Sequence, residues 1–193
     1  ALGLGFSAGP GLALARFPGR GLVVSAVNTG MGLPPVVVGL FVTLLLWRSG
    51  PLGDLEVLYT PAVIVLAQAV IAATIVTGIT LAAVGQVPRE FRLQLHALGA
   101  SRMQMVWMVL REARLPMLAA VMAGFGGIIS EIGASMMVGG NIKGQTRTLT
   151  TAMVLETGKG NFDVAIALSL LLLVLIFLVN WALTTIQQRR APG

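Results

Sequence analysis

The sequence contains no cysteine and only one histidine, His96. The lack of cysteine excludes disulfides, thiolate metal sites and thiol catalysis, and a single histidine leaves no histidine cluster to hold a metal. Charged side chains are also scarce, at 10% of the 193 residues, whereas a soluble domain carries about 25%. With 56% hydrophobic residues and a mean hydropathy of +0.90, the chain is expected to be an integral membrane protein.

Long uncharged tracts dominate the sequence. Four of them can cross a bilayer as helices, because a span needs about 20 residues to cover about 30 Å of hydrocarbon. These tracts comprise residues 21–47, 57–88, 115–142 (interrupted only by Glu131) and 164–188. Together they predict an all-α fold, a polytopic bundle of transmembrane helices.

The opening tract, residues 1–15, is apolar, short and rich in glycine. Because the sequence begins with Ala1 rather than methionine, we expect this tract to be the end of a further span whose start precedes Ala1. The prediction is then about five spans, of which the first is truncated.

The charges separate into two groups when successive tracts are taken to cross the membrane in alternating directions. One side has a net charge of +7 from these residues: Arg16, Arg20, Arg89, Glu90, Arg92, Arg102, Arg111, Glu112, Arg114, Arg189 and Arg190. The other side has a net charge of zero from these residues: Arg48, Asp54, Glu56, Lys143, Arg147, Glu156, Lys159 and Asp163. Cytoplasmic loops carry an excess of Lys and Arg, so the first side is expected to face the cytoplasm. The net positive charge of the chain therefore reflects its membrane topology, and nucleic acid is not an expected partner.

The predicted cytoplasmic segment 89–114 is the one long polar excursion on the inner side. Three apolar residues at i, i+4 and i+7 form a stripe on one face, namely Phe91, Leu95 and Leu98. This stripe predicts a short amphipathic helix. Gly99 is a typical helix stop, and a second amphipathic run follows it into the next span. A short helix held across the membrane surface suits docking of a soluble partner; the alternative is a helix that only lies on lipid.

Residues 95–116, LHALGASRMQMVWMVLREARLP, resemble the cytoplasmic coupling loop of type I ABC importer permeases. The family pattern is Glu-Ala-Ala, three residues, Gly, and then a helix start that contains proline. Residues 99–102 match its glycine turn and Pro116 matches a second proline. Residues 93–95 differ from the Glu-Ala-Ala triplet, and Glu112 stands where the first family proline falls.

Two further blocks narrow the resemblance. Residues 31–40, MGLPPVVVGL, resemble the double-proline segment of oxyanion permeases. Residues 129–157, ISEIGASMMVGGNIKGQTRTLTTAMVLET, are similar to the tungstate-type branch. Molybdate and sulfate permeases usually have Thr-Leu-Pro-Leu where this chain has Thr-Leu-Thr-Thr at 148–151. The resemblance therefore favours tungstate as cargo, and molybdate or sulfate remains the alternative.

The resemblance implies a transport subunit and not an enzyme. In that family two permease copies form the pathway, two ATPase subunits grip the coupling loops, and an extracytoplasmic binding protein delivers the anion. The implied location is the bacterial or archaeal plasma membrane, and residues 1–193 form a single transmembrane domain with its coupling loop at about 89–114. The chain contains no Gly-x-x-x-x-Gly-Lys-Ser/Thr phosphate loop. ATP and Mg²⁺ are therefore expected on the partner ATPase, and no cofactor on this chain.

The resemblance also assigns expected contacts on the coupling loop. We expect the contact with the ATPase subunit to consist of Leu95, Leu98, Gly99 and Ala100. The rim of that contact is expected to consist of Arg92, His96, Ser101 and Arg102.

Residues inside the spans are candidates for the pathway and its gate. Pro34 and Pro35 remove two consecutive backbone donors and predict a bend in the second span, which either faces the pathway or serves helix packing. Glu131 costs energy inside a membrane and is a poor ligand for an anion, so we expect it to accept hydrogen bonds from neighbouring helices. Glu131 is expected to hold the segment that contains Ser135, Met136 and Met137. The two methionines either plug the closed pathway or pack as ordinary apolar residues.

The predicted outer segment, residues 141–163, carries the better chemistry for an anion. Charges and hydroxyl donors that suit a tetrahedral oxyanion are supplied by Lys143, Thr146, Arg147, Thr148, Thr150 and Thr151. The alternative is a solvated loop that touches the binding protein. A different class of function, an ATP-independent channel or carrier, has no use for the short inner helix with its glycine turn. A membrane enzyme would need a catalytic constellation that the chain does not offer.

Overall fold

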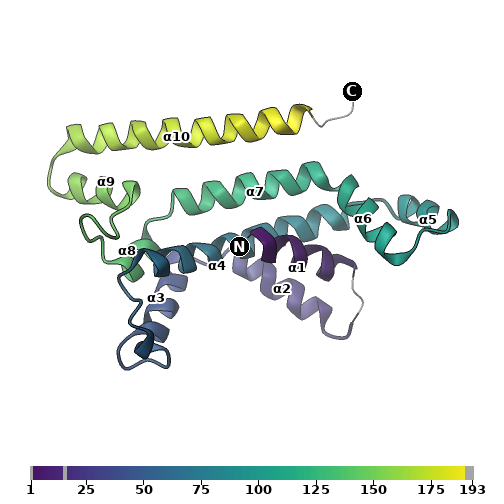
Figure 1. The fold of residues 1–193 in the computed structure, drawn as a ribbon, viewed down its shortest axis with the longest axis horizontal. Coiled ribbons are helices and arrows are strands. Elements are labelled where there is room, and N and C mark those ends of the chain that lie inside the picture. Colours follow the sequence, from purple (N-terminus) through teal and green to yellow (C-terminus); the bar gives the residue numbers. More distant parts are fainter. Residues whose placement is uncertain (1, 15–16, 190–193) are drawn as a thin grey trace. The chain divides into compact units, whose positions relative to one another are not determined.

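The chain folds into a succession of α-helices (Figure 1). The computed structural model describes residues 2–14 and 17–189, and within them it contains no β-strand. The helices, with one short 3₁₀ turn labelled η1, are α1 (Leu2–Leu14), α2 (Arg20–Met31), α3 (Pro35–Leu46), η1 (Gly53–Leu55), α4 (Pro61–Gly85), α5 (Arg89–Ala97), α6 (Arg102–Glu112), α7 (Arg114–Ile129), α8 (Gly133–Gly139), α9 (Leu149–Gly158) and α10 (Phe162–Arg189). Ala1, Ala15, Arg16 and Arg190, which belong to the predicted first span and inner charges, lie outside the described residues.

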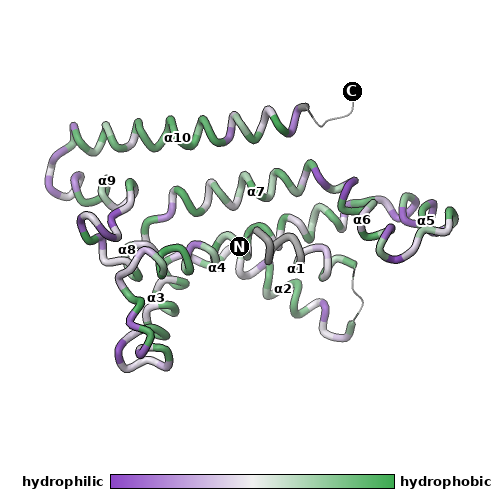
Figure 2. Tube along the Cα trace, viewed as in Figure 1, coloured by the Kyte–Doolittle hydropathy of each residue, from purple (hydrophilic) through white to green (hydrophobic). Residues whose placement is uncertain are grey.

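Two helices are each long and apolar enough to cross a membrane, α4 and α10. The described residues offer up to four spans if the pairs α2–α3 and α6–α7 each count as one span. Hydrophobic residues dominate α4 and α10, whereas α5 is largely hydrophilic (Figure 2). The predicted all-helical, polytopic fold is confirmed, although α1, with 13 residues, is too short to count as a span by itself.

The chain divides into two compact units, each assembled from segments that are distant in the sequence. Unit 1 comprises residues 1–31, 73–124 and 183–193, and unit 2 comprises residues 32–72 and 125–182. Every charge predicted for the cytoplasmic side belongs to unit 1, and every charge predicted for the outer side belongs to unit 2. Each unit therefore contains the charges of one predicted side only.

The predicted second span, residues 21–47, is not one bent helix. Helix α2 ends at Met31, and α3 begins at Pro35 with Pro34 as its N-cap. Proline lacks the backbone donor that a helix interior needs but fits the first helical position, so the proline pair starts a new helix instead of bending an old one. The prediction located the disruption correctly and underestimated it.

The predicted span 115–142 is also interrupted. Helix α7 ends at Ile129, residues 130–132 are not helical, and the seven-residue α8 follows. Glu131 therefore lies in a break between two helices and not on a continuous helix. At its other end α7 meets α6 at a bend of 62°.

The core of unit 1 lies where the end of α4 meets α6. The buried cluster consists of Ala83, Val84, Val87, Val109 and Ala113. Partly buried apolar residues of α1, α5 and α7 pack against it, among them Ala13, Phe91 and Met117. The loop helices α5 and α6 are thereby fixed to the end of a long apolar helix.

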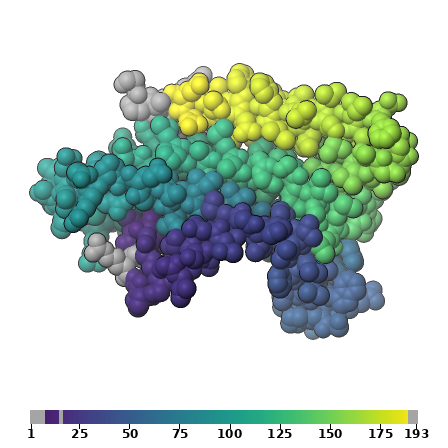
Figure 3. All heavy atoms as spheres, turned by 180° about the vertical axis from the view of Figure 1, so that it is seen from behind, coloured from purple at the N-terminus to yellow at the C-terminus, as the bar shows by residue number. Residues whose placement is uncertain are grey.

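Unit 2 is built around the contact between α3 and α8. A Cβ atom added at Gly39 would lie 2.7 Å from the Ala134 Cα atom, so only glycine permits this approach of the two backbones. The hydroxyl of Ser169 in α10 lies 2.7 Å from the Met153 sulfur, and Figure 3 shows α9 and the first turns of α10 in direct contact. The short helices of the outer segment are thus packed elements and not free loops.

Candidate functional site

The predicted coupling loop contains the expected helix and turn. Helix α5 ends with Leu98 as its C-cap, and Gly99 follows with a φ of +75°. The Gly99 N–H donates to the His96 carbonyl and the Ala100 N–H donates to the Leu95 carbonyl, both at 3.0 Å. These two bonds form a Schellman motif, in which glycine supplies the left-handed residue. The predicted helix stop at Gly99 is confirmed.

Helix α6 begins at a capping box that the sequence analysis missed. The Ser101 hydroxyl accepts a hydrogen bond from the Gln104 N–H at 3.3 Å, and the Gln104 side chain accepts one from the Ser101 N–H at 2.8 Å. The signal was present as Ser-x-x-Gln just before an apolar run. Ser101, predicted at the rim of a partner contact, has its side chain engaged in starting α6.

Arg92 connects the loop to the preceding long helix. Its Nη2 atom donates a hydrogen bond of 2.6 Å to the carbonyl of Val84, near the end of α4. This carbonyl lies in the last turn of α4, where helix carbonyls lack intrahelical partners. Arg92 therefore fixes α5 to α4, in addition to any contact at the surface of the loop.

The other predicted coupling residues divide into supporting and exposed positions. Leu95 is buried, so its side chain stabilises the loop from within and does not lie on its surface. Leu98 is 83% exposed, which is unusual for a leucine in a packed turn. His96, Gly99 and Arg102 are also exposed. At the turn, Leu98 thus presents a large apolar side chain beside basic and small residues.

Glu131 binds the start of α8. Its carboxylate oxygens accept hydrogen bonds from the Ala134 N–H at 2.6 Å, the Ser135 N–H at 3.1 Å and the Ser135 hydroxyl at 3.0 Å. The prediction that Glu131 accepts hydrogen bonds and holds this segment is confirmed. Its expected donors were wrong, because all three belong to the following helix and not to neighbouring ones. Free N–H groups at a helix start need such an acceptor, and Glu131 lies within reach only because the chain breaks at residues 130–132.

Two further polar contacts surround the joint between α7 and α8, which consists of Glu131 and the residues it binds, Ala134 and Ser135. The Thr150 hydroxyl donates to the Glu131 backbone carbonyl at 3.2 Å, which ties the start of α9 to the break. The Gln68 amide donates to the Ser135 hydroxyl at 3.4 Å, from the middle of the apolar helix α4. Gln68 was missed by the sequence analysis, although an amide well inside an uncharged tract was a usable signal. The joint is therefore held from three directions.

The candidate gate residues lie at different depths in unit 2. Pro34 and Met136 are exposed, Pro35 and Met137 are half-buried, and Ser135 is buried. A Cβ atom added at Gly39 would lie 3.3 Å from the Met137 Cβ atom, so Met137 packs beside α3. Of the two methionines, Met136 is the one with a substantially exposed side chain.

The threonines of the predicted outer contact are engaged within the chain. Thr148 and Thr151 form a capping box at the start of α9, and Thr146 donates to the Gly139 carbonyl. Thr146, Thr150 and Thr151 are buried, whereas Lys143 is exposed. The threonines thus stabilise the outer segment and do not present free donors together at its surface.

Arg147 stabilises a strained residue in the same segment. Asn141 has a φ of +52°, and its side-chain oxygen and backbone carbonyl accept hydrogen bonds from Arg147 at 3.2 and 3.3 Å. The Asn141 amide in turn donates to the Thr151 carbonyl at 3.3 Å. Arg147 therefore contributes to the shape of the loop as well as its charge.

One ionisable group of the outer segment has a shifted pKa. The Asn161 amide and the Lys159 ammonium each donate a hydrogen bond of 2.7 Å to Glu156, and together they hold the pKa of its carboxyl below the ordinary value. These bonds close the turn between α9 and α10. Across the described residues, no group of three His, Cys, Asp or Glu side chains is placed to hold a metal ion.

The chain is similar to known membrane transport proteins along its length. It matches the family model described as "Binding-protein-dependent transport system inner membrane component" over residues 1–192. It is 43% identical over 198 residues to a "Probable anion ABC transporter permease protein" of Haloferax volcanii. The aligned region covers 100% of this chain and 84% of that protein.

Two further relatives carry more specific names. The chain is 35% identical over 175 residues to a "Tungstate uptake system permease protein TupB" of Peptoclostridium acidaminophilum, covering 91% of this chain and 77% of that protein. It is 27% identical over 192 residues to the "Molybdenum transport system permease protein ModB" of Escherichia coli, covering 93% and 84% respectively. The predicted resemblance to the tungstate-type branch is thus confirmed. The chain therefore belongs to the family of binding-protein-dependent transport system inner membrane components, as a multi-pass plasma-membrane permease subunit of an ABC importer for an anion and not as an enzyme.

Proposed function

We propose that the chain is the translocating subunit of a tungstate importer, with molybdate or sulfate as the alternative cargo. The similarity to a tungstate permease over 91% of the chain supports this choice over the molybdate relative, which is less similar. Two copies form the pathway as a homodimer, since a two-fold pair can line a pore with the same helices from each copy. Each copy contributes residues 1–193 as a single transmembrane domain.

The observation that carries the proposal is the turn at Gly99. A Schellman turn followed directly by a capping box fixes the exposed Leu98 between two short helices that share a core with the end of α4. An apolar side chain held in this way suits insertion into a soluble partner, and we assign it to the ATPase subunit. Arg92, His96, Gly99, Ala100 and Arg102 surround it, and Leu95 supports it from within. ATP and Mg²⁺ then bind to the ATPase and not to this chain.

We assign the gate to α8 and the chain break before it. Glu131 holds the start of α8 through three hydrogen bonds, and Gly39 allows α3 to pack directly on Ala134. Met136 is the exposed member of the methionine pair, and in this proposal it obstructs the closed pathway with Met137 behind it. Ser135 and the proline pair at 34–35 keep α8 and α3 in place.

The outer segment is assigned to the arrival of the anion and its binding protein. Lys143 and Arg147 supply positive charge, while Thr146, Thr148, Thr150 and Thr151 maintain the fold of the segment that carries them. Such a surface attracts an anion weakly, which suits a subunit that must release what it carries. High affinity then belongs to the binding protein.

Reconstitution tests the proposal. The chain is placed in proteoliposomes with the ATPase and the binding protein of the same system, and uptake of radioactive tungstate, molybdate and sulfate is compared. We expect tungstate uptake that requires ATP and all three components, and a mass of the purified complex that contains two copies of this chain. Uptake by the chain alone, or preference for another anion, would contradict the corresponding part of the proposal.

A further inference from the structure

A pocket of about 450 Å³ lies in unit 1, where the end of α4 meets α5 and α6. Two arginines and the one histidine of the chain line it from α5, namely Arg89, Arg92 and His96. These residues stand at i, i+3 and i+7, so they share one face of the helix. Glu90, the acidic residue of α5, does not line the pocket. The wall therefore carries positive charge without a carboxylate to balance it.

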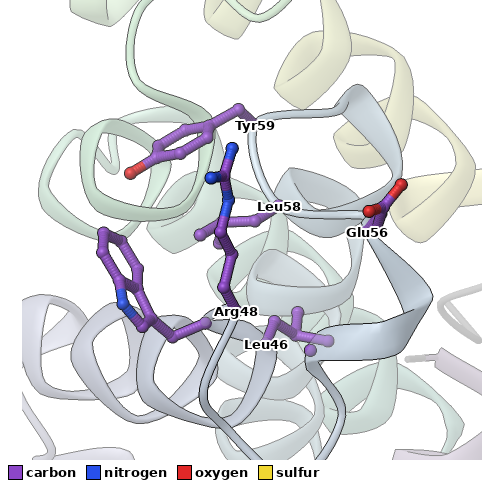
Figure 4. Close-up of a pocket in the computed structure, with 7 residues that line it drawn as sticks. Leu46, Arg48, Glu56, Leu58 and Tyr59 are labelled. Atoms are coloured by element: carbon purple, nitrogen blue, oxygen red, sulfur yellow. The ribbon is translucent and has the colours of Figure 1, made fainter.

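A pocket in unit 2 provides a comparison for this charge. It has the same volume, and its wall contains one arginine and one glutamate, Arg48 and Glu56, beside aromatic and aliphatic side chains (Figure 4). Its formal charge is zero, whereas two arginines give the pocket of unit 1 a formal charge of +2 before His96 is counted. Of these two pockets, the one in unit 1 is suited to an anion.

The arginines of this pocket have hydrogen-bonding capacity that the chain does not use. Arg92 donates from Nη2 to the Val84 carbonyl, but its buried Nε atom has no acceptor in the part of the chain that the structure describes. Neither Arg89 nor Arg92 forms an ion pair with any residue of the ranges 2–14 and 17–189. A buried donor without an acceptor costs free energy. An anionic oxygen atom in the pocket is the strongest acceptor for such a group.

The pocket lies at the predicted cytoplasmic surface of the membrane. It adjoins Gly85 and Val87, at the end of the apolar helix α4 that is long enough to cross a membrane. On α6, Trp107 is 57% exposed and the Arg111 guanidinium lies 5.2 Å from the centre of its ring. Tryptophan is enriched at the boundary between hydrocarbon and water, and arginine extends from there toward the headgroups. Lipid phosphates are therefore the anions expected at this depth.

From these observations we infer that the pocket binds the phosphate of an anionic phospholipid from the cytoplasmic leaflet. Clustered arginines on the cytoplasmic side attract anionic lipids, and guanidinium donors suit phosphate oxygens. The volume lies within the range of about 300–1,000 Å³ that is typical of small-molecule sites, which leaves room for the glycerol part of a headgroup beside its phosphate. The inference goes beyond the proposed function and holds whichever anion is transported.

The lipid and the ATPase approach α5 from different sides. Leu98, which the proposed function places in the ATPase contact, follows Arg89 by nine residues, or about two and a half turns, and so lies on the opposite side of the helix. A phosphate in the pocket bridges Arg89 and Arg92, and Arg92 is already bonded to the Val84 carbonyl of α4. An occupied pocket therefore strengthens the attachment of α5 to α4, and with it the coupling of the loop to the membrane helices.

Native mass spectrometry of the purified transporter tests the binding. Dioleoyl phosphatidylglycerol is titrated against dioleoyl phosphatidylcholine, which has the same chains and a phosphate but no net charge. We expect wild type to prefer phosphatidylglycerol, and Arg89→Gln to weaken its binding about fivefold, the share of one basic side chain near the headgroups. Arg102→Gln removes the same charge from an exposed position of the loop outside the pocket, and we expect a change of less than about twofold. Equal effects of the two variants, or no preference between the lipids, would overturn the inference.

Inorganic phosphate distinguishes a lipid headgroup from a free anion. Thermal unfolding of the transporter in neutral detergent is measured with dioleoyl phosphatidylglycerol, with inorganic phosphate and with both. We expect phosphatidylglycerol to raise the Tm of wild type but not of Arg89→Gln, and inorganic phosphate at constant ionic strength to raise neither. If inorganic phosphate stabilises wild type alone and displaces the lipid, the pocket is a site for a free anion and the inference is wrong.

Uptake by proteoliposomes shows whether the site acts on coupling. ATP-driven uptake is compared between phosphatidylcholine vesicles with and without phosphatidylglycerol. We expect phosphatidylglycerol to raise uptake by wild type several-fold and to have no such effect on Arg89→Gln. Arg89→Lys keeps the charge and should retain most of the stimulation. Equal stimulation of wild type and Arg89→Gln would overturn the role in coupling. If no tested oxyanion is transported but the lipid binds as expected, the proposed function fails and the lipid site stands.

Discussion

Unit 1 and unit 2 contrast first in charge. Unit 1 contains nine arginines and two glutamates, whereas unit 2 contains four basic and five acidic residues. The contrast follows the rule that places positive charge on the cytoplasmic side of a membrane. The packing of the chain into two units and the distribution of its charges therefore divide the sequence in the same way.

The units also differ in how they make their critical turns. Unit 1 forms the loop at Gly99 with backbone hydrogen bonds and a capping box, all within residues 94–104. Unit 2 forms the joint before α8 with a buried glutamate and with contacts from Gly39, Gln68 and Thr150. The first turn is local and the second depends on residues far apart in the sequence. The joint thus ties several helices together, whereas the hydrogen bonds of the turn stay within α5, α6 and the residues between them.

Replacement of Glu131 should be among the changes with the largest effect. Glu131→Ala leaves the Ala134 and Ser135 N–H groups without their acceptor, and each such buried group costs about 1–3 kcal/mol. We expect oxyanion uptake in proteoliposomes to fall at least about tenfold, while insertion, assembly and ATP turnover persist. Glu131→Gln retains an acceptor oxygen and should keep a larger share of uptake. Normal uptake by the alanine variant would refute the role of this joint.

Substitution at Gly99 tests the local turn. Valine is strained at a φ of +75°, so Gly99→Val should abolish the turn and uncouple uptake from ATP hydrolysis while the protein still inserts. Gly99→Ala should cost about 1–2 kcal/mol and reduce uptake several-fold. Gly85→Ala adds a methyl group to open space in the same unit, and we expect it to transport normally. Unimpaired coupling in Gly99→Val would count against the assignment of this loop.

Gly39 tests the close approach in unit 2. An added methyl group would lie 2.7 Å from a backbone carbon of α8, so Gly39→Ala must displace that helix. Overpacking of this kind costs about 1–3 kcal/mol, and we expect lower thermal stability with a three- to tenfold loss of uptake. Gly126→Ala, in α7 with open space around it, is the matched control. A stability loss in the control equal to that in Gly39→Ala would show that the contact is unimportant.

The smallest effect concerns pH at the end of α9. Because the folded pKa of Glu156 is lowered, the stabilisation is present above the ordinary glutamate pKa, about 4.3, and is lost as the pH falls through the folded value. Thermal unfolding of wild type and Glu156→Gln, compared between pH 7 and pH 3, should show a small difference that disappears at acid pH. A difference that persists at pH 3 would exclude this carboxylate as its cause.

The sequence predicted the parts of the fold that depend on neighbouring residues. The apolar stripe and Gly99 specified the end of α5, and the proline pair marked where α2 and α3 separate. The break at residues 130–132 could not be predicted in the same way, because an uncharged stretch with one glutamate also fits a continuous helix. What decides the outcome is that Glu131 finds three donors at the start of α8, which only the folded chain reveals.

The outer threonines show a related limit. Their residue type correctly indicates hydrogen-bonding capacity, but the sequence does not reveal which hydroxyls are already engaged. Thr148 and Thr151 bond to each other at the start of α9, and Thr150 bonds to the Glu131 carbonyl. Burial of Thr146 and Thr151 therefore follows from structural use within the segment.

The cap on α8 also bears on electrostatics. A bare carboxylate would repel a passing dianion, and a low-dielectric interior would strengthen that repulsion. In this joint the partial positive charges of two amide hydrogens and one hydroxyl hydrogen lie against the Glu131 oxygens. These dipoles weaken the field of the carboxylate on the side where they lie. An acidic residue used to brace a short helix can in this way coexist with a route for negatively charged solutes.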